Sequence, residues 1–303
     1  MDHFDTMGVT DMKKDLCFAL VGGDLRQSCL ANLLADEGYE VYALGFDDCV
    51  ELSDQVCCTA DLMGALSKCD VAIFPLPLTV DGAAVNAPFA KEPPALRDCF
   101  RALNKDALLL GGMADEEVCA LAREYGFAVL DYYQREEMIV LNCVPTAEGA
   151  LCIAMQETAK TIFGSKCLVT GFGRVSKAMT ALLLACGAKV SVAARKQGDL
   201  AWIKLMGAEP VPMAKLKEAA AGQEIIFNTV PVKLFDEDVL CALHKDCLLI
   251  DLASKPGGVD LSAARHLGLR VIWALSLPGK VAPISAAQII KDTVFNILEE
   301  RGA

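Results

Sequence analysis

The sequence lacks any long hydrophobic run, and this argues against a membrane-spanning protein. Its apolar stretches are short, like the one over 71–74, and charged residues, glycine or proline interrupt them. A membrane-spanning helix needs about 18 or more consecutive apolar residues. Residues 1–14 also lack the hydrophobic core of a secretory signal, so we expect 1–13 to be a short disordered overhang and the protein to be cytoplasmic.

Positive charge is in deficit, and this disfavours partners that carry a high density of negative charge. The 303 residues include 28 Lys and Arg against 40 Asp and Glu, which gives a formal net charge of −12. Nucleic acids and anionic membrane surfaces attract basic surfaces, so we expect neither as a partner. An anionic small-molecule substrate therefore requires a local basic pocket.

Cysteine is abundant, with 14 residues, but its spacing is not that of a metal site or a disulfide scaffold. The cysteines are scattered through apparent strands and helices, and the adjacent pair Cys57 and Cys58 has no histidine nearby. We therefore expect no metal ion, and most of the thiols should be small buried hydrophobic groups in a reducing cytosol.

The length and the hydrophobic pattern predict two α/β domains. With 54% hydrophobic residues the chain can fill two cores, and strand patterns alternate with helical ones along nearly its whole length. Such alternation is typical of parallel sheets flanked by helices. The expected fold is two Rossmann-like, doubly wound domains with a cleft between them. The expected strands are 16–21, 40–44, 71–74, 107–110 and 127–130 in the first domain, and 166–170, 189–193, 224–228, 247–252 and 270–273 in the second.

A glycine-containing turn in the middle of the chain has the form of a dinucleotide-binding site. The apolar strand that ends at Thr170 passes through Gly171, Phe172 and Gly173 into a helix rich in alanine and leucine. Gly171 allows a tight turn, Gly173 lets the backbone approach a pyrophosphate, and the helix amides hold the negative charge. Ser176 stands where the third fingerprint position is usually Gly or Ala, and it is small enough to keep the pattern.

A basic pair after the next strand favours NADP over NAD. Enzymes that use NAD normally carry an acidic residue there for the ribose 2′-hydroxyl, whereas Arg195 and Lys196 suit a 2′-phosphate. Loops after the later strands are expected to complete the cofactor site. The predicted cofactor-binding residues are Gly171, Phe172, Gly173, Arg174, Val175, Ser176, Ala194, Arg195, Lys196, Asn228, Thr229, Val230, Pro231, Leu252 and Gly279.

Proline marks the expected boundary between the domains. Pro145 is expected to break the chain, and Thr146 to cap the helix that follows. Apolar residues at helical spacing near the C-terminus predict a last helix that returns to pack on the first domain. The predicted segments are a substrate domain at 14–145, an NADP-binding domain at 146–284 with a connecting helix at 146–163, and the C-terminal helix at 285–303.

Loops at the carboxyl ends of the strands are expected to face the cleft, where doubly wound sheets bind ligands. Gly22-Gly23-Asp24 lacks the spacing of a phosphate loop, so we interpret it as a substrate loop from which Arg26 can fork onto a carboxylate. Lys255 and Lys280 add positive charge from the second domain. The alternative is that Arg26 is a surface residue and the other loops are only turns and helix caps. The predicted substrate-binding residues are Asp24, Arg26, Gln27, Thr79, Gly149 and Lys280.

Histidine is scarce, and this restricts the chemistry. His3 lies in the overhang, His244 precedes a strand at the wrong end of the sheet, and His266 lies in a surface-like helix. A 2-hydroxyacid dehydrogenase commonly uses a histidine as general base, so that reaction is disfavoured. A hydride transfer driven by ring aromatisation needs less help, and Glu148 or Asp81 can take the accompanying proton unless each is only a cap or turn residue. The predicted catalytic residues are Glu148, Thr146, Ser254, Lys255 and Asp81.

Several stretches, spread from about residue 16 to the C-terminus, carry a more specific pattern than the dinucleotide turn. They are Gly22-Gly23-Asp24 with Arg26-Gln27, Pro75-Leu76-Pro77 with Asp81-Gly82, Pro145-Thr146 with Glu148-Gly149, Gly171-Phe172-Gly173-Arg174, 251–258 and 277–283. By these stretches the chain resembles the dipicolinate synthase family of spore-forming bacteria, in particular its A subunit. Ser176, where the family often has glycine, and Thr79, where it often has serine, depart from the pattern.

The resemblance implies an activity, a cofactor and a partner. The implied reaction oxidises dihydrodipicolinate, or the hydroxytetrahydro precursor that dehydrates to it, to dipicolinate with NADP as the acceptor. The implied partner is a flavoprotein-like B subunit, on which alone FMN is expected, and the implied location is the mother-cell cytoplasm during sporulation. The resemblance leaves open the stoichiometry with that partner and whether the chain forms a homo-oligomer.

Two other functions are compatible with the residues. Without an obvious acid/base pair, the chain can be a non-catalytic scaffold that binds NADP and presents it to the B subunit. It can also be another NADP-dependent cleft dehydrogenase that acts on a hydroxy or amino acid. The lack of a histidine base or a catalytic arginine–acid pair ranks this second alternative last.

Overall fold

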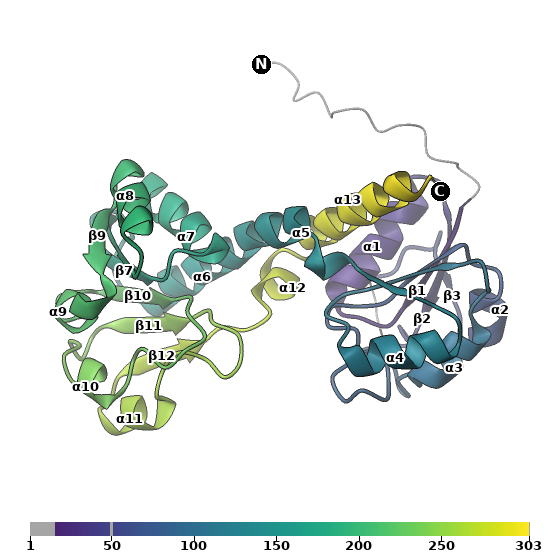
Figure 1. Cartoon of the computed structure of the whole chain (residues 1–303), viewed down its shortest axis with the longest axis horizontal. Coiled ribbons are helices and arrows are strands. Elements are labelled where there is room, and N and C mark those ends of the chain that lie inside the picture. Colours follow the sequence, from purple (N-terminus) through teal and green to yellow (C-terminus); the bar gives the residue numbers. More distant parts are fainter. Residues whose placement is uncertain (1–15, 49–50, 303) are drawn as a thin grey trace, which may run out of the picture. The chain divides into compact units, whose positions relative to one another are not determined.

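The computed structural model describes residues 16–48 and 51–302, which form two compact units. The first unit contains Met1–Ile139 and Pro283–Ala303, and the second contains Val140–Ala282. The overhang expected over 1–13 lies outside the described residues. Each unit is built around one sheet that has helices on both of its faces (Figure 1).

The first unit has a six-stranded sheet in which all neighbouring strands run parallel. The strand order is β3-β2-β1-β4-β5-β6, so the order reverses between β1 and β4. The strands are β1 Cys17–Val21, β2 Glu40–Leu44, β3 Cys57–Cys58, β4 Val71–Ile73, β5 Leu108–Gly111 and β6 Val129–Asp131. The helices are α1 Leu25–Asp36, α2 Leu62–Leu66, α3 Leu96–Ala102, α4 Glu116–Glu124, the 3-10 turn η1 Tyr132–Gln134, α5 Glu136–Leu141 and α13 Pro283–Arg301.

The C-terminal helix α13 belongs to the first unit, as the sequence predicts. Its buried residues Ile290 and Val294 share an apolar cluster with Leu30 of α1, and the two helices lie side by side in Figure 1. Lys291, which is almost fully buried, forms an ion pair with Glu37 just after α1. The two helices together cover one face of the sheet.

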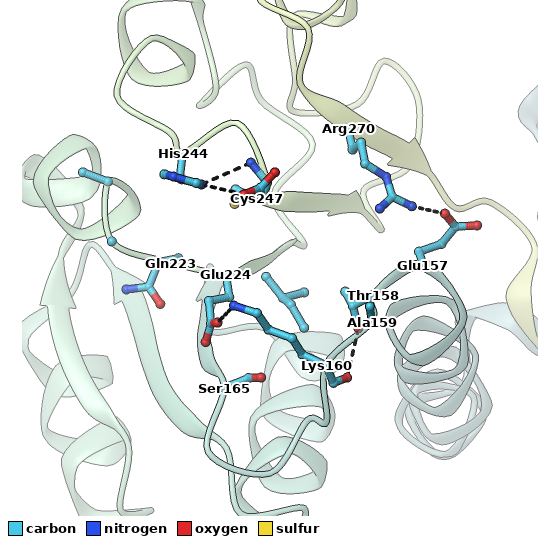
Figure 2. A pocket seen from close by; sticks show the side chains of 14 residues that line it. Glu157, Thr158, Ala159, Lys160, Ser165, Gln223, Glu224, His244, Cys247 and Arg270 are labelled. Carbon is cyan, nitrogen blue, oxygen red and sulfur yellow. Dashed lines mark hydrogen bonds and ion pairs between the residues drawn. The ribbon is translucent and has the colours of Figure 1, made fainter.

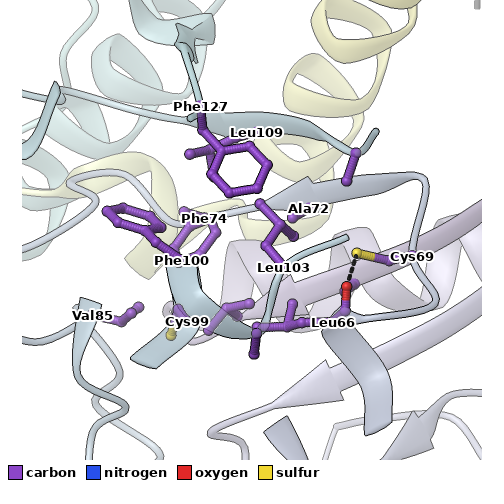
Figure 3. Packing of buried hydrophobic residues seen from close by; sticks show 14 of the residues in the cluster. Leu66, Cys69, Ala72, Phe74, Val85, Cys99, Phe100, Leu103, Leu109 and Phe127 are labelled. Carbon is purple, nitrogen blue, oxygen red and sulfur yellow. Dashed lines mark hydrogen bonds between the residues drawn. The ribbon is translucent and has the colours of Figure 1, made fainter. Parts of the chain in front are cut away.

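The opposite face of the first sheet carries a second apolar cluster. Figure 3 shows Phe74, Phe100 and Leu103 packed together with the strand residues Ala72 and Leu109. The ring centroids of Phe74 and Phe100 are 5.8 Å apart. Both faces of the sheet are thus filled with apolar side chains, as is typical of parallel sheets, and polar groups gather at the strand ends.

The second unit repeats this architecture. Its strand order is β12-β11-β10-β7-β8-β9, all parallel, with the reversal between β7 and β10. The predicted fold class, two doubly wound parallel-sheet domains, is therefore confirmed. The strands are β7 Lys166–Thr170, β8 Lys189–Ala194, β9 Glu209–Pro212, β10 Ile225–Asn228, β11 Leu248–Asp251 and β12 Arg270–Trp273. The helices are α6 Cys143–Glu157, α7 Arg174–Ala185, α8 Gln197–Leu205, the 3-10 turn η2 Met213–Lys215, α9 Leu216–Ala220, α10 Glu237–Leu240, α11 Leu261–His266 and α12 Leu277–Val281.

Two edge strands have no counterpart among the predicted ones. β3 has only two residues, and β9 contains two prolines, Pro210 and Pro212. A run of two residues shows no alternating pattern, and proline within a run argues against a strand. Proline is accepted in β9 because this strand is at the edge of its sheet. The other strands begin and end within two residues of the predicted positions.

The predicted break at Pro145 is wrong. The N-cap of α6 is Asn142, so Pro145 and Thr146 lie in the first turn of that helix. Proline is tolerated there because the first amides of a helix have no intrahelical partner. Thr146 does not cap the helix, since its Oγ1 donates to the carbonyl oxygen of Asn142 at 2.8 Å. The helix ends at Glu157, short of the predicted 163.

One continuous stretch, Glu136–Glu157, has the length and composition of a membrane span, with a mean hydropathy of 1.6 in its most apolar window. Its residues Ala147, Ala150 and Ala154 are buried in the apolar cluster of the second unit together with Met179 of α7. Core helices of folded units satisfy the same criteria of length and composition. The expectation that the chain has no membrane partner stays a prediction.

Shortening a side chain of α13 tests how this helix is held. Ile290 is 1% exposed, and truncating a buried isoleucine to alanine costs about 2–5 kcal/mol of stability. We expect Ile290→Ala to lower the free energy of urea unfolding by this amount. Ile284→Ala is the matched control, because Ile284 is 66% exposed on the same helix and should change it by less than about 0.5 kcal/mol. Identical unfolding curves for the two variants would contradict the packing.

Candidate functional site

The turn between β7 and α7 presents a helix start that has no side-chain cap. Gly171 has a φ of +87°, which residues with a Cβ rarely adopt. A Cβ on Gly171 would lie 2.7 Å from Val230 Cγ2 and 2.9 Å from Thr229 Oγ1. Gly173 is the N-cap of α7, and none of the described atoms outside the turn lies within 4 Å of where its Cβ would be. The turn therefore offers helix amides and open space to an anion.

Ser176 takes an active part in this turn. Its side chain is fully buried, and its Oγ donates to the carbonyl oxygen of Gly171 at 2.6 Å. The amide of Gly171 in turn donates to the carbonyl of Ala193 on β8 at 2.8 Å. A serine at the third fingerprint position thus closes the turn with a bond that Gly or Ala cannot make.

A pocket of about 350 Å³ opens beside the turn. Arg195 and Lys196 are exposed on its wall, and neither forms an ion pair within residues 16–48 and 51–302. Nine of the predicted cofactor residues line it: Gly171, Phe172, Gly173, Ala194, Arg195, Lys196, Thr229, Val230 and Pro231. The predicted residues Arg174, Val175, Ser176, Asn228, Leu252 and Gly279 do not.

Four residues on the wall of this pocket were not predicted from the sequence. They are Asp199, Met213, Val232 and Leu234. Asp199 lies in the first turn of α8, directly beyond the basic pair, and its position there is a signal that could have been used. Met213 comes from the turn η2 after β9, a strand that was itself missed, so no signal pointed to it.

Buried polar side chains join the loops behind the pocket. Asn228 at the end of β10 is fully buried; its Oδ1 accepts from Thr170 Oγ1 at 2.5 Å, and its Nδ2 donates to Asp251 Oδ1 at 2.7 Å. The same amide accepts from the backbone N of Val230 at 3.2 Å and donates to its carbonyl at 3.1 Å. Asn228 therefore shapes the loop that lines the pocket. Thr170 and Asp251 were not predicted.

The loop after β11 carries two of the predicted catalytic residues, Ser254 and Lys255, and both are exposed. Its backbone is held by the end of the strand, because the amide of Ala253 donates to Oδ1 of Asp251 at 3.1 Å. Trp273 Nε1 donates to the carbonyl of Ala253 at 2.9 Å. The loop thus has a fixed base and two polar side chains directed to solvent.

Helices α6 and α12 carry the remaining predicted residues of the second unit. Gly149 of α6 is buried, and a Cβ there would lie 3.0 Å from Val281 Cγ2 of α12, so this glycine allows the two helices to pack closely. The hydroxyl of Thr146 is bonded within its own helix. Glu148 and Lys280 are exposed, and their side chains are accessible to a ligand.

The corresponding turn in the first unit is closed by the chain itself. The amide of Gly23 donates to the carbonyl of Asn86 at 2.8 Å. A Cβ on Gly22 would lie 2.8 Å from Val85 Cγ1 and 2.9 Å from Ala87 Cβ. A phosphate cannot take the place here that it takes in a dinucleotide turn, in agreement with the interpretation that this is not a phosphate loop.

Arg26 is anchored at the switch point of the first sheet. Its Nε and Nη2 donate to Asp24 at 2.8 and 2.9 Å, and Nη2 also donates to the carbonyl of Leu76 at 2.6 Å. Burial opposes the charge, but the hydrogen bond and the charge of Asp24 outweigh it and raise the pKa of the guanidinium. Arg26 is only 8% exposed, so the alternative that it is a surface residue is wrong.

Three further predicted residues of the first unit form hydrogen bonds with the backbone of that unit. Gln27 is buried, and its Nε2 donates to the carbonyl of Ile73 at 3.3 Å. Thr79 Oγ1 donates to the carbonyl of Ala84 at 2.5 Å. The amides of Ala84 and Ala83 donate to Asp81 Oδ1, and they lower the pKa of that carboxyl. A carboxylate with a lowered pKa is a weaker base, which disfavours Asp81 as the proton acceptor.

A larger hollow, of about 400 Å³, lies at the amino ends of the strands of the second sheet, whereas the pocket beside Gly171 lies at their carboxyl ends. None of the predicted site residues lines this hollow. Figure 2 shows its charged side chains turned toward one another: Lys160 pairs with Glu224 at 2.5 Å, and Arg270 pairs with Glu157. His244 lies 3.5 Å from Asp246. Because Lys160 and Arg270, the lysine and the arginine that line it, each face an acid, the hollow leaves no free positive charge for an anionic substrate.

Among the described residues, no group of His, Cys, Asp and Glu is arranged to hold a metal ion. The thirteen cysteines of that part of the chain are all unbridged; six of them are buried, and Cys57 and Cys58 are exposed on β3. Burial raises the pKa of Cys99, Cys167 and Cys247 to about 12. Such thiols are packing groups and not nucleophiles.

Comparison with known proteins gives matches along nearly the whole chain. Residues 17–133 match the family model for the N-terminal domain of the A subunit of dipicolinate synthase. The chain is 31% identical over 291 residues to the A subunit of dipicolinate synthase from Bacillus subtilis (strain 168), an alignment that covers 95% of this chain and 98% of that protein.

Two solved structures have the same arrangement of elements. The A chain of dipicolinate synthase from Bacillus subtilis superposes with a TM-score of 0.82 at 30% identity, covering 94% of this chain and 96% of that one. The corresponding dipicolinate synthase chain from Bacillus halodurans gives a TM-score of 0.84 at 27% identity, covering 93% and 97%.

Adding a single methyl group tests the geometry of the turn. In Gly171→Ala the new Cβ meets Thr229 and Val230 in a backbone conformation that disfavours it, so we expect stability to fall by more than about 1 kcal/mol. Gly173→Ala is the control, because its φ of −82° is ordinary and its Cβ position is open. Thermal unfolding of the two variants checks this, and equal unfolding midpoints would contradict the close contact of Gly171 with Thr229 and Val230.

Proposed function

Because the chain belongs to the family of the dipicolinate synthase A subunit, we propose that it oxidises dihydrodipicolinate to dipicolinate with NADP as the acceptor. The substrate is dihydrodipicolinate itself or the hydroxytetrahydro precursor that loses water to give it. The dihydro compound gives up one hydride and one proton, and its ring becomes aromatic. The observation that carries the proposal for this chain is the pocket beside Gly171, whose wall bears Arg195 and Lys196.

The residues around this pocket fit NADP. The uncapped start of α7 can bind a pyrophosphate, and the open space at Gly173 allows it to approach. Arg195 and Lys196 match the charge of a 2′-phosphate, and Asp199 is the single acid among the lining residues. When bound, NADP supplies the hydride acceptor.

Three cations are proposed as candidate contacts for a substrate carboxylate. In the second unit these are Lys255 and Lys280, which are both exposed. In the first unit Asp24 and the carbonyl of Leu76 accept hydrogen bonds from Nε and Nη2 of Arg26. We assign the remaining nitrogen, Nη1, to a substrate carboxylate. Asp24 then acts through Arg26, because it fixes the plane of the guanidinium.

Glu148 is the proposed proton acceptor. The other carboxylate considered for this role, Asp81, has a lowered pKa, which makes it a weaker base than an ordinary aspartate. Glu148 is exposed on α6, close in sequence to the internally bonded Thr146 and on the same unit as the nucleotide pocket. Hydroxyl groups of Thr146 and Ser254 are proposed to contact the ring. Gln27, Thr79 and Gly149 are proposed to shape the substrate loops, each within its own unit.

A partner chain is part of the proposal. The names of the relatives identify one lettered component of dipicolinate synthase, which supports a second component; we propose a flavoprotein-like B chain that holds any FMN. The proposed location is the mother-cell cytoplasm, with neither nucleic acid nor membrane as a partner. The exposure of Glu148, Ser254 and Lys255 also fits the alternative in which this chain is a scaffold that presents NADP to its partner.

Reversing one charge tests the cofactor assignment. We expect Arg195→Asp to raise the Kd for NADP by about tenfold or more, because a charge-assisted contact to the 2′-phosphate is replaced by repulsion. The Kd for NAD should change far less. Lys189→Asp makes a similar charge change at the opposite end of the same strand, β8, and should leave both values unaltered. An unchanged ratio of the two Kd values in Arg195→Asp would remove the NADP assignment.

The reaction itself is tested by ultraviolet detection of dipicolinate and NADPH from freshly generated precursor and NADP. The assay uses the purified chain alone and then its mixture with the B chain. Product from the chain alone, lost in Glu148→Gln while NADP binding persists, is the expected result. Product only with both chains, unaffected by Glu148→Gln, would support the scaffold alternative. If neither mixture gives product although NADP binds, the substrate assignment is wrong.

A further inference from the structure

Asp251 is a buried carboxylate that has no cation beside it. It ends β11, is 2% exposed and forms no ion pair within the part of the chain that the structure describes. A buried carboxylate is costly unless its oxygens accept hydrogen bonds. Both oxygens of Asp251 are satisfied by neutral donors: Oδ1 by Asn228 Nδ2 and the amide of Ala253, and Oδ2 by the amide of Gly258 at 2.8 Å.

These donors come from one loop and from the end of the neighbouring strand β10. Ala253 and Gly258 are the first and last residues of loop 253–258, which carries Ser254 and Lys255. Asn228 holds both backbone groups of Val230, a residue on the wall of the nucleotide pocket. Asp251 therefore links loop 253–258 to the residue that shapes the pocket wall.

The strand register explains why these side chains meet. Asn228 is paired with Thr170 in the ladder between β10 and β7, and with Asp251 in the ladder between β10 and β11. All three residues are the last of their strands. Gly258 completes the contact, since a Cβ there would lie 2.5 Å from the carbonyl oxygen of Val230. The two loops are thus in direct contact as well as joined through Asp251.

We infer that Asp251 is a positioning residue that couples the nucleotide loop 229–231 to the catalytic loop 253–258. This inference rests on the proposed function, because it takes the pocket beside Gly171 as the nucleotide site. A nucleotide that settles against Val230 fixes the Asn228 amide, and Asp251 passes that constraint to the amides of Ala253 and Gly258. Loop 253–258 is then ordered for the substrate only when the cofactor is in place.

Trp273 provides a natural reporter on the second loop. Its Nε1 donates to the carbonyl of Ala253, and its ring would lie 3.2 Å from a Cβ on Gly257. The chain has two tryptophans, and the other one, Trp202, is exposed on α8 and does not line the pocket. Trp202→Phe leaves Trp273 as the single tryptophan, whose emission follows loop 253–258.

The experiment titrates NADP in its oxidised form into the Trp202→Phe chain while the Kd is measured separately by calorimetry. Trp273 emission is expected to change along the binding isotherm. In Asp251→Asn the amide group presents a donor where an acceptor is needed, so we expect the Kd to rise about tenfold and the emission change to be lost at saturation. In the Trp202→Phe chain that keeps Asp251, NADP binding without a change in Trp273 emission would overturn the coupling.

Thr170 supplies the matched comparison. Thr170→Val keeps the shape and removes only the hydroxyl that bonds Asn228, so it should raise the Kd but leave the Trp273 response at saturation. Thr170→Ser, which restores the hydroxyl, should recover the original Kd. A wild-type Kd and response in Asp251→Asn would overturn the inference alone. Absence of NADP binding to the unaltered chain would overturn the proposed function as well.

If Asp251→Asn does not fold, the coupling is still tested by Thr170→Val and Thr170→Ser together with the unaltered chain. The coupling then requires a Trp273 response that saturates with NADP and a Kd that follows the presence of the hydroxyl. A Kd that is the same in all three chains would overturn it. A purely structural role would lower the melting temperature of the variants and leave the Kd at low temperature unchanged.

Discussion

The buried amide of Asn228 is the interaction on which the loops of the second unit depend. An asparagine side chain has one acceptor and two donors, and a fully buried one must find its partners within the protein. Thr170, Val230 and Asp251 provide them. Losing any of these bonds would leave a polar group buried and unpaired, at a cost of about 1–3 kcal/mol. The loops after β7, β10 and β11 are therefore joined through this one side chain.

The fold could be predicted from the sequence because its signals are local. Apolar strands that alternate with helices indicate two parallel sheets, and the apolar spacing of α13 indicates a buried face. The failures have physical causes as well. Two residues of β3 are too few for a pattern, and the prolines of β9 are compatible with a strand only at the edge of a sheet. Pro145 suggested a break, yet the first turn of α6 accepts it because no intrahelical bond is lost there.

The site could be predicted only in part. The turn at Gly171 and the pair Arg195–Lys196 are short motifs, and the structure places all of them on one pocket. The groups that hold this pocket come from strands that are distant in the chain. Thr170 and Asp251 look like ordinary strand ends in the sequence. They become neighbours of Asn228 only when the order β7-β10-β11 and its register are known. The burial of Arg26 likewise depends on the carbonyl of Leu76, which follows a different strand.

The two units show how one topology acquires two roles. Each has a glycine turn after its first strand and a helix of twelve residues beyond it. In the first unit the side chain of Asp24 caps the helix and the segment at Asn86 covers the turn. A carboxylate and the chain itself thus occupy the place of a phosphate. In the second unit the cap is Gly173, which brings neither charge nor bulk, and the cations on the pocket wall are Arg195 and Lys196. In the first unit the carboxylate of Asp24 therefore offsets the partial positive charge at the start of the helix. In the second unit no acidic cap does so, and this charge can attract an anionic ligand.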